Sequence, residues 1–153
     1  MFLRRNILII VATVLAAFTT PVLAHDDAPA HDMHRIVIQV SDNDPGTFTK
    51  VLNNVGNMSK FFLDRGEDYE IEVVVYNAGL HMLRADTSDV LERLDNMAVS
   101  VPNLTFSACG NTIELMSKKA GKQVEITQSA RVVPGGIIRL MELSDQGYFM
   151  IRP

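Results

Sequence analysis

Apolar residues in this chain alternate between short β-branched runs and stripes at helical spacing. Strands are predicted at residues 35–40 (RIVIQV), 69–76 (YEIEVVVY), 104–108 (LTFSA), 131–133 and 148–151, and residues 124–126 form either a short strand or an extended loop. The first runs are nearly continuous, which is typical of strands buried on both faces of a parallel sheet.

Helices are predicted between the strands from their stripes and their end signals. Residues 44–45 (DP) suit a helix start, as do residues 87–89 (TSD) and residues 134–136 (PGG). Asn111, with Glu114 three residues later, is typical of a capping box. Three glycines mark predicted helix ends, namely Gly66, Gly121 and Gly147.

This alternation predicts a single α/β domain. Strand–helix–strand units favour a three-layer α/β/α sandwich with a mainly parallel sheet of about five strands. Right-handed crossovers place helices on both faces of such a sheet. The length of 153 residues also favours one domain over two.

The N-terminal segment has the pattern of a secretory signal peptide. Arg4 and Arg5 precede the apolar residues 7–18, and residues 22–24 (VLA) offer small residues for cleavage. The apolar run is shorter than the ~20 residues that span a bilayer as a helix. We therefore predict a signal peptide at residues 1–24, a flexible lead-in at residues 25–33 and the α/β domain at residues 34–153. The protein is then periplasmic or otherwise exported, with no membrane association after cleavage.

The lead-in is rich in histidine and aspartate. Cleavage after residue 24 makes His25 the mature N-terminus, and His31 and His34 follow it. A free amine next to imidazoles can chelate copper, whereas a spacer with incidental histidines explains the same residues. Both interpretations, a copper site and a simple spacer, remain open, and no metal site is assigned.

Charge and motifs exclude several classes of partner. The net charge is −4, so the protein has no positive field that would gather nucleic acid or anionic lipid. Neither a P-loop nor a Gly-x-Gly-x-x-Gly segment occurs, and we expect no cofactor.

Cys109 is the single cysteine of the chain and the candidate catalytic residue. It has no partner for a disulfide within its own chain, so it is a working thiol, an intermolecular partner or a buried, inert side chain. The thiol comes just before a predicted helix start. A helix start stabilises a thiolate and lowers its pKa, although burial acts in the opposite direction.

Polar and glycine residues at the predicted strand ends complete a candidate ligand pocket, because ligands of open parallel sheets bind at the carboxyl ends of strands. The residues in question are Asn77, His81, Gly110, Asn111, Thr112, Pro134, Gly135 and Gly136. His81 is either an acid or base near Cys109 or a side chain packed between leucines.

Several segments resemble the DsrE/DsrF-like family of sulfur-handling proteins. They are residues 71–79 (IEVVVYNAG), 106–112 (FSACGNT), 132–140 (VVPGGIIRL) and 146–153 (QGYFMIRP). The resemblance implies a compact α/β fold, homo-oligomers such as trimers or hexamers, and sulfur carried as a persulfide on a cysteine. The cysteine in the matching segment is Cys109, and that role is carried over to it alone.

Two functions follow as hypotheses. In the first, the protein is a sulfur carrier or sulfurtransferase that holds a persulfide on Cys109 and works with a donor or acceptor protein. In the second, it is a non-catalytic oligomeric module that binds a small ligand or partner, and Cys109 is structural. A sulfur that lines an open pocket favours the first, and a sulfur enclosed by apolar atoms favours the second.

Overall fold

The structure is a computed structural model that describes residues 33–153. The predicted signal peptide and all but the last residue of the lead-in lie outside these residues, as do His25 and His31. His34 is the first residue of the first strand, and its Nε2 lies 3.1 Å from Oε2 of Glu67. His34 therefore belongs to the folded domain.

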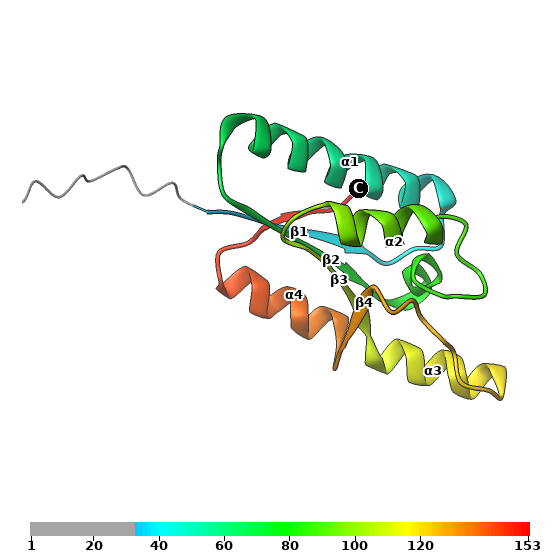
Figure 1. Cartoon of the computed structure of the whole chain (residues 1–153). Helices are drawn as coiled ribbons and strands as arrows, with labels where there is room; N and C mark the ends of the chain where they lie inside the picture. Colours follow the sequence, from blue (N-terminus) through cyan, green and yellow to red (C-terminus); the bar gives the residue numbers. More distant parts are fainter. Residues whose placement is uncertain (1–32) are drawn as a thin grey trace, which may run out of the picture. The chain divides into compact units, whose positions relative to one another are not determined.

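Strands and helices alternate along the described chain (Figure 1). The elements are β1 (His34–Val40), α1 (Pro45–Arg65), β2 (Tyr69–Val75), the 3₁₀ helix η1 (Asn77–Met82), α2 (Leu91–Ser100), β3 (Leu104–Cys109), α3 (Gly110–Ala120), β4 (Ala130–Val133), α4 (Gly136–Asp145) and β5 (Phe149–Ile151). The sheet has five strands, all parallel, in the order β4-β3-β2-β1-β5. The predicted three-layer α/β/α fold is confirmed.

The strand order explains which helix covers which face. From β1 to β4 each strand is added beside the previous one in the same direction, whereas the connection from β4 to β5 returns to the opposite edge. Right-handed crossovers then place α1, α2 and α3 on one face and α4 on the other (Figure 1).

Two apolar clusters fill the spaces between the layers. The larger lies under α1, α2 and α3, where Phe48 and Leu94 pack with Ile38 and Phe106 of the sheet. The smaller lies under α4 and contains Val37, Val74, Tyr76, Cys109, Leu140 and Leu143. Cys109 thus belongs to the thinner of the two cores.

The first helix has the predicted ends. The Asp44 carboxylate accepts hydrogen bonds from the backbone N–H groups of Gly46 at 3.1 Å and Thr47 at 3.0 Å. Gly66 ends the helix with φ 67°, a left-handed conformation that glycine adopts without strain.

The predicted capping box at α3 is wrong. The helix begins one residue before Asn111, at Gly110, and Cys109 occupies the N-cap position. Glu114 does not turn back to the backbone, because its Oε1 accepts a hydrogen bond from Nζ of Lys118 at 2.6 Å. An i, i+4 ion pair has satisfied the carboxylate instead.

The predicted cap at residues 87–89 is also wrong, whereas the two alternatives for residues 124–126 are reduced to one. Residues 87–89 do not cap α2, because the helix begins later, at Leu91 after the N-cap Val90. Ser88 Oγ donates to the Met82 carbonyl at 2.7 Å and accepts from the Val90 N–H at 3.4 Å, one residue before the helix. Residues 124–126 are the predicted extended loop, with a single antiparallel bridge between Arg84 and Ile126.

Candidate functional site

Cys109 lies where neighbouring strands send their chains to opposite faces of the sheet. It ends β3, which continues into α3 on one face, while the adjacent β4 continues into α4 on the other. Such a switch point leaves a crevice at the carboxyl ends of the two strands, where open α/β sheets bind ligands. The pocket that the sequence predicts at the strand ends is therefore located between β3 and β4.

The crevice is a cavity of about 260 Å³ that Cys109 lines. The structure brings together six of the predicted site residues there, namely Cys109, Asn77, Asn111, Thr112, Gly135 and Gly136. Sequence reasoning missed the apolar part of the lining, which consists of Tyr76, Leu115, Ile137 and Ile138. Cys109 is only 6% exposed, so this cavity is its route to solvent.

Gly110 and Pro134 support the cavity without lining it. A Cβ at Gly110 would lie 3.1 Å from the carbonyl oxygen of Val133, so glycine lets α3 start close to β4. The carbonyl of Pro134 accepts a hydrogen bond from the Asn111 backbone N–H at 3.3 Å. Both residues thus join the start of α3 to the turn before α4.

His81 is not among the residues that line this cavity. Its Nδ1 lies 2.9 Å from Oγ1 of Thr87, in the loop that follows η1. The expectation that His81 belongs to the Cys109 pocket is not met, because the 3₁₀ turn of η1 carries the chain away from the strand end.

The groups around Cys109 favour its thiolate. Burial raises the pKa of the thiol, but hydrogen bonding by the Thr112 side chain and by the backbone N–H groups of Gly136, Thr112 and Asn111 together lowers it further than burial raises it. The resulting pKa lies below the ordinary value for cysteine. The thiolate is stabilised from the first turn of α3 and also from the first turn of α4.

Thr112 is itself oriented by the end of β2. Its Oγ1 accepts a hydrogen bond from the backbone N–H of Asn77 at 3.1 Å. With this acceptor position used, the hydroxyl proton is available to the sulfur. Two helix starts and an oriented hydroxyl around a nucleophilic sulfur suit an anion held on that sulfur.

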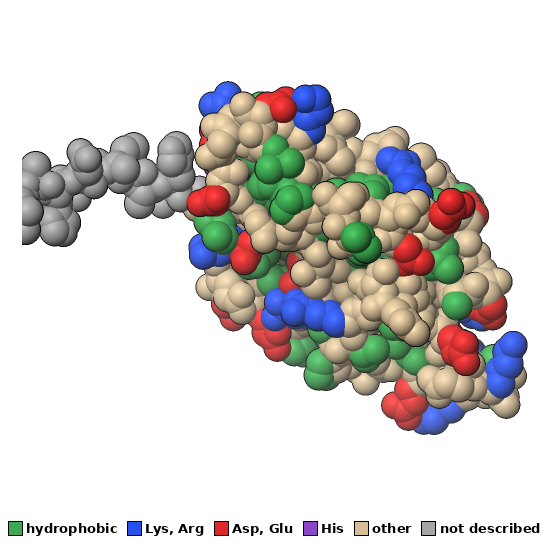
Figure 2. Space-filling model, in the orientation of Figure 1, with side chains coloured by type: hydrophobic (Ala, Val, Ile, Leu, Met, Phe, Trp, Pro, Cys, Tyr) green, Lys and Arg blue, Asp and Glu red, His purple; other side chains and the backbone are tan. Residues whose placement is uncertain are grey.

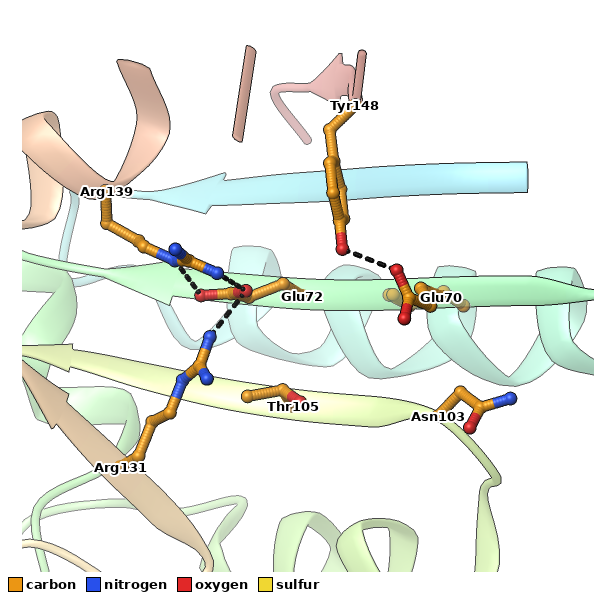
Figure 3. A pocket seen from close by; sticks show the side chains of 8 residues that line it. Glu70, Glu72, Asn103, Thr105, Arg131, Arg139 and Tyr148 are labelled. Atoms are coloured by element: carbon orange, nitrogen blue, oxygen red, sulfur yellow. Dashed lines mark hydrogen bonds and ion pairs between the residues drawn. The ribbon is translucent and has the colours of Figure 1, made fainter. Parts of the chain in front are cut away.

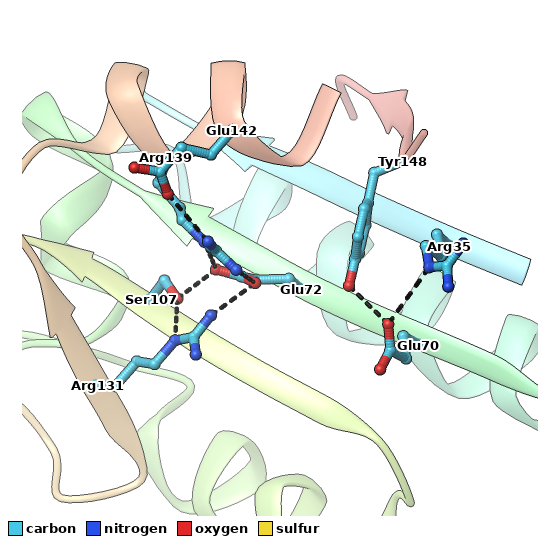
Figure 4. A network of polar contacts seen from close by, with 8 residues as sticks. All are labelled: Arg35, Glu70, Glu72, Ser107, Arg131, Arg139, Glu142 and Tyr148. Atoms are coloured by element: carbon cyan, nitrogen blue, oxygen red, sulfur yellow. Dashed lines mark hydrogen bonds and ion pairs between the residues drawn. The ribbon is translucent and has the colours of Figure 1, made fainter. Parts of the chain in front are cut away.

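A buried carboxylate, Glu72, lies on the face of the sheet that α4 covers (Figure 4). Cys109 belongs to the apolar cluster on this same face. Its Oε1 and Oε2 each accept a hydrogen bond from Arg139 at 2.9 Å. Nη2 of Arg131 lies 2.7 Å from Oε2, and Ser107 Oγ donates to Oε1 at 2.6 Å. Nε of Arg131 also donates to Ser107 Oγ at 3.0 Å, which closes the network. The network joins β2, β3, β4 and α4.

The network borders a polar cavity of about 320 Å³ on the uncovered part of the sheet (Figure 3). Thr105 and Asn103 line its floor, and Glu70 and Tyr148 lie at the end away from Arg131. The Tyr148 hydroxyl donates to Glu70 Oε2 at 2.7 Å. Burial, followed by this carboxylate, raises the pKa of Tyr148 to about 12.

Sequence reasoning did not identify this network. Residues 69–76 were interpreted simply as a buried strand, although Glu70 and Glu72 alternate with Ile71 and Val73. Alternation of this kind indicates that one face of the strand is polar. That signal could have revealed the carboxylates, but their arginine partners come from β4 and α4 and have no local pattern.

Apolar side chains surround the mouth of the Cys109 cavity. Leu115, Ile137 and Ile138 line it and are each more than half exposed, and Met141 is exposed one turn farther along α4. Figure 2 shows apolar side chains that reach the surface over α4. The rim of the thiol cavity is therefore apolar, whereas its floor is polar.

Within residues 33–153, no group of three or more histidine, cysteine, aspartate or glutamate side chains is arranged to hold a metal ion. In the same residues, no helix combines the length and the apolar character that crossing a bilayer requires.

Comparisons with known proteins support the fold and name no activity. No family model matches the chain, and no curated protein matches it. The domain is similar to the solved structure of a protein of unknown function from Methanobacterium thermoautotrophicum. The TM-score is 0.66 and the identity 25%, over 78% of this chain and 99% of that chain. This likeness agrees with the predicted fold class.

Proposed function

We propose that the protein is a sulfur carrier of the DsrE/DsrF-like type, which holds sulfur as a persulfide on Cys109. One observation carries the proposal: the only cysteine of the chain lines a cavity at the switch point of the sheet, where Thr112 and Gly136 stabilise its thiolate. A cysteine whose only role is packing needs neither an open cavity nor groups that stabilise its anion.

The proposed reaction is an exchange of sulfur between thiols. The Cys109 thiolate attacks the outer sulfur of a donor persulfide; the new S–S bond forms as the donor's S–S bond breaks, and the donor leaves as a thiolate. An acceptor thiolate then attacks the outer sulfur, and Cys109 leaves as a thiolate. The transferred sulfur keeps its oxidation state, so no oxidant or reductant is consumed.

Residues of the cavity have distinct roles in this scheme. Thr112 and the Gly136 N–H stabilise the negative charge on the attacking sulfur and, after transfer, on the persulfide. Asn77 orients Thr112 through its backbone N–H. The apolar rim of Leu115, Ile137 and Ile138 receives the donor or acceptor.

Intact-mass measurement tests the proposal. Folded protein is incubated with glutathione persulfide, and we expect a mass increase of one sulfur atom that dithiothreitol removes. The Cys109→Ser variant should gain nothing. Loading of the folded protein should be faster than loading of protein unfolded in urea. Equal or slower loading of the folded form contradicts the carrier function.

The non-catalytic binding module is the second candidate. It is favoured by the packing of Cys109 in the apolar cluster with Val74 and Leu140. In that case Cys109 alkylates only after denaturation and no sulfur is loaded, while the cavity still binds a small ligand or partner.

Export and self-association belong to the same proposal. The pattern of residues 1–24 supports a cleaved leader, so the native protein should begin at His25 on N-terminal sequencing. Exposed apolar side chains outside the cavity rim, such as Met141 and Phe149, support a homo-oligomer, for which the family resemblance implies a trimer or hexamer. Light scattering of the mature protein should then give a mass of several chains.

A further inference from the structure

The first turn of α4 connects the Cys109 cavity with the buried Glu72. Gly136, at the start of the helix, lines the cavity. Arg139 lies one turn later, and its backbone N–H donates to the Gly135 carbonyl at 2.9 Å. A hydrogen-bonded helical turn is rigid, so whatever fixes Arg139 also fixes Gly136.

We propose that Glu72 is a positioning residue for the Cys109 site: its carboxylate fixes Arg139 and the first turn of α4, so that the Gly136 N–H stays beside the sulfur. This inference rests on the proposed function and deepens it, because it names what sets the reactivity of the same thiol.

The contacts of Glu72 suit this role. The Nε and Nη2 atoms of Arg139 each donate to the carboxylate at 2.9 Å, a two-point contact that fixes orientation as well as distance. Glu72 is itself 4% exposed and is held from the other side by Arg131 and Ser107. The carboxylate therefore has little freedom to move with the helix.

A second contact limits the approach of α4 from the opposite direction. A Cβ on Gly136 would lie 2.7 Å from Cβ of Tyr76, so the helix start already touches the end of β2. Tyr76 prevents the helix from moving closer to the sheet, and Glu72 prevents it from moving away. Together they define the position of the Gly136 N–H.

A direct effect of the Glu72 charge on Cys109 would have the opposite sign. Removal of a negative charge makes a nearby thiolate easier to form, whereas loss of the Gly136 contact makes it harder to form. The carboxylate contacts Ser107 Oγ, and Cys109 lies two residues beyond Ser107 on the same face of β3, which corresponds to about 7 Å of strand. Salt screens buried groups of this kind only weakly, but Arg131 and Arg139 both pair with the carboxylate and already balance its charge. The positioning effect should therefore dominate.

The experiment measures the rate of Cys109 alkylation by iodoacetamide against pH. In Glu72→Gln we expect the midpoint to rise by about one pH unit, the size expected for one lost hydrogen bond to a charged group. At a pH below both midpoints, alkylation should then be about tenfold slower. The control is Glu70→Gln, on the same strand and face, which bonds Tyr148 instead of α4 and should leave the midpoint unchanged.

Arg139→Lys is the second variant, in case Glu72→Gln does not fold. It keeps the charge and leaves Glu72 paired with Arg131, but it loses the two-point contact. A raised midpoint here cannot come from a change in charge. An unchanged or lowered midpoint in folded Glu72→Gln or in Arg139→Lys overturns the proposal. Because alkylation does not require a persulfide, this result is independent of whether the protein carries sulfur.

Discussion

The backbone N–H of Asn77 donates to Oγ1 of Thr112 at 3.1 Å, across the gap between the end of β2 and the start of α3. Asn77 makes this contact from a left-handed conformation with φ 50°, which asparagine tolerates better than most residues. The contact ties the loop after β2 to the first turn of α3. It also orients the Thr112 hydroxyl, which is therefore directed to donate a hydrogen bond to the Cys109 sulfur.

Removal of the Thr112 hydroxyl should make Cys109 less reactive. In Thr112→Val we expect the midpoint of Cys109 alkylation to rise by about one pH unit, because a hydrogen bond to the thiolate is lost. The Asn77 N–H also loses its acceptor, so unfolding in urea should show a loss of about 1 kcal/mol. Thr112→Ser keeps the hydroxyl and serves as the control. A midpoint in Thr112→Val equal to that of the wild type is evidence against the role of the hydroxyl.

Glu72 should contribute stability that disappears in acid. Burial raises the pKa of its carboxyl, but hydrogen bonds from Arg139, Ser107 and Arg131 lower it further, so the folded-state pKa lies below the ordinary value of 4.5. A group with a depressed folded-state pKa stabilises the fold above its unfolded-state pKa. That contribution is lost as pH falls from 4.5 through the folded-state pKa.

Urea unfolding of Glu72→Gln measures this contribution. At neutral pH we expect a loss of about 3 kcal/mol, because two arginines lose a buried partner. In acid, below the folded-state pKa, the difference from the wild type should shrink as the native carboxyl also becomes neutral. Glu142→Gln removes the exposed end of the same network and should cost less than about 1 kcal/mol. A difference that does not depend on pH would show that the carboxylate charge is not involved.

Gly136 should not tolerate even a methyl group. Its Cβ would lie 2.7 Å from Cβ of Tyr76, so Gly136→Ala must move the start of α4. We expect a loss of about 2 kcal/mol in the free energy of unfolding and a higher midpoint for Cys109 alkylation.

Gly56→Ala, within α1, is the matched control. The added Cβ would contact only Cε of Met97 in α2, at 3.9 Å. There alanine should stabilise the helix by about 0.5–1 kcal/mol. If both substitutions stabilise the protein equally, the contact between α4 and Tyr76 is looser than described.

Local patterns were sufficient for the fold class and for six of the ten residues that line the cavity. The runs at residues 35–40 and 69–76 gave strands because β-branched side chains suit buried, extended backbone. Gly66 and Gly121 were correctly predicted as helix ends, with φ 67° and 65°. Cys109 and residues 134–136 were placed at strand ends by the same reasoning. The capping box failed because α3 begins at Gly110, before Asn111, and because Glu114 pairs with Lys118; a three-residue spacing shows neither.

The sequence by itself determined that strands and helices alternate and that the one cysteine stands at a strand-to-helix junction. Only the tertiary structure decided that β3 and β4 are neighbours whose chains diverge, which creates the cavity. It also decided that Glu72 meets Arg131 and Arg139, which lie 59 and 67 residues away along the chain. Periodicity specifies the faces of one element at a time, whereas these contacts depend on strand order and crossover handedness, which bring distant residues together.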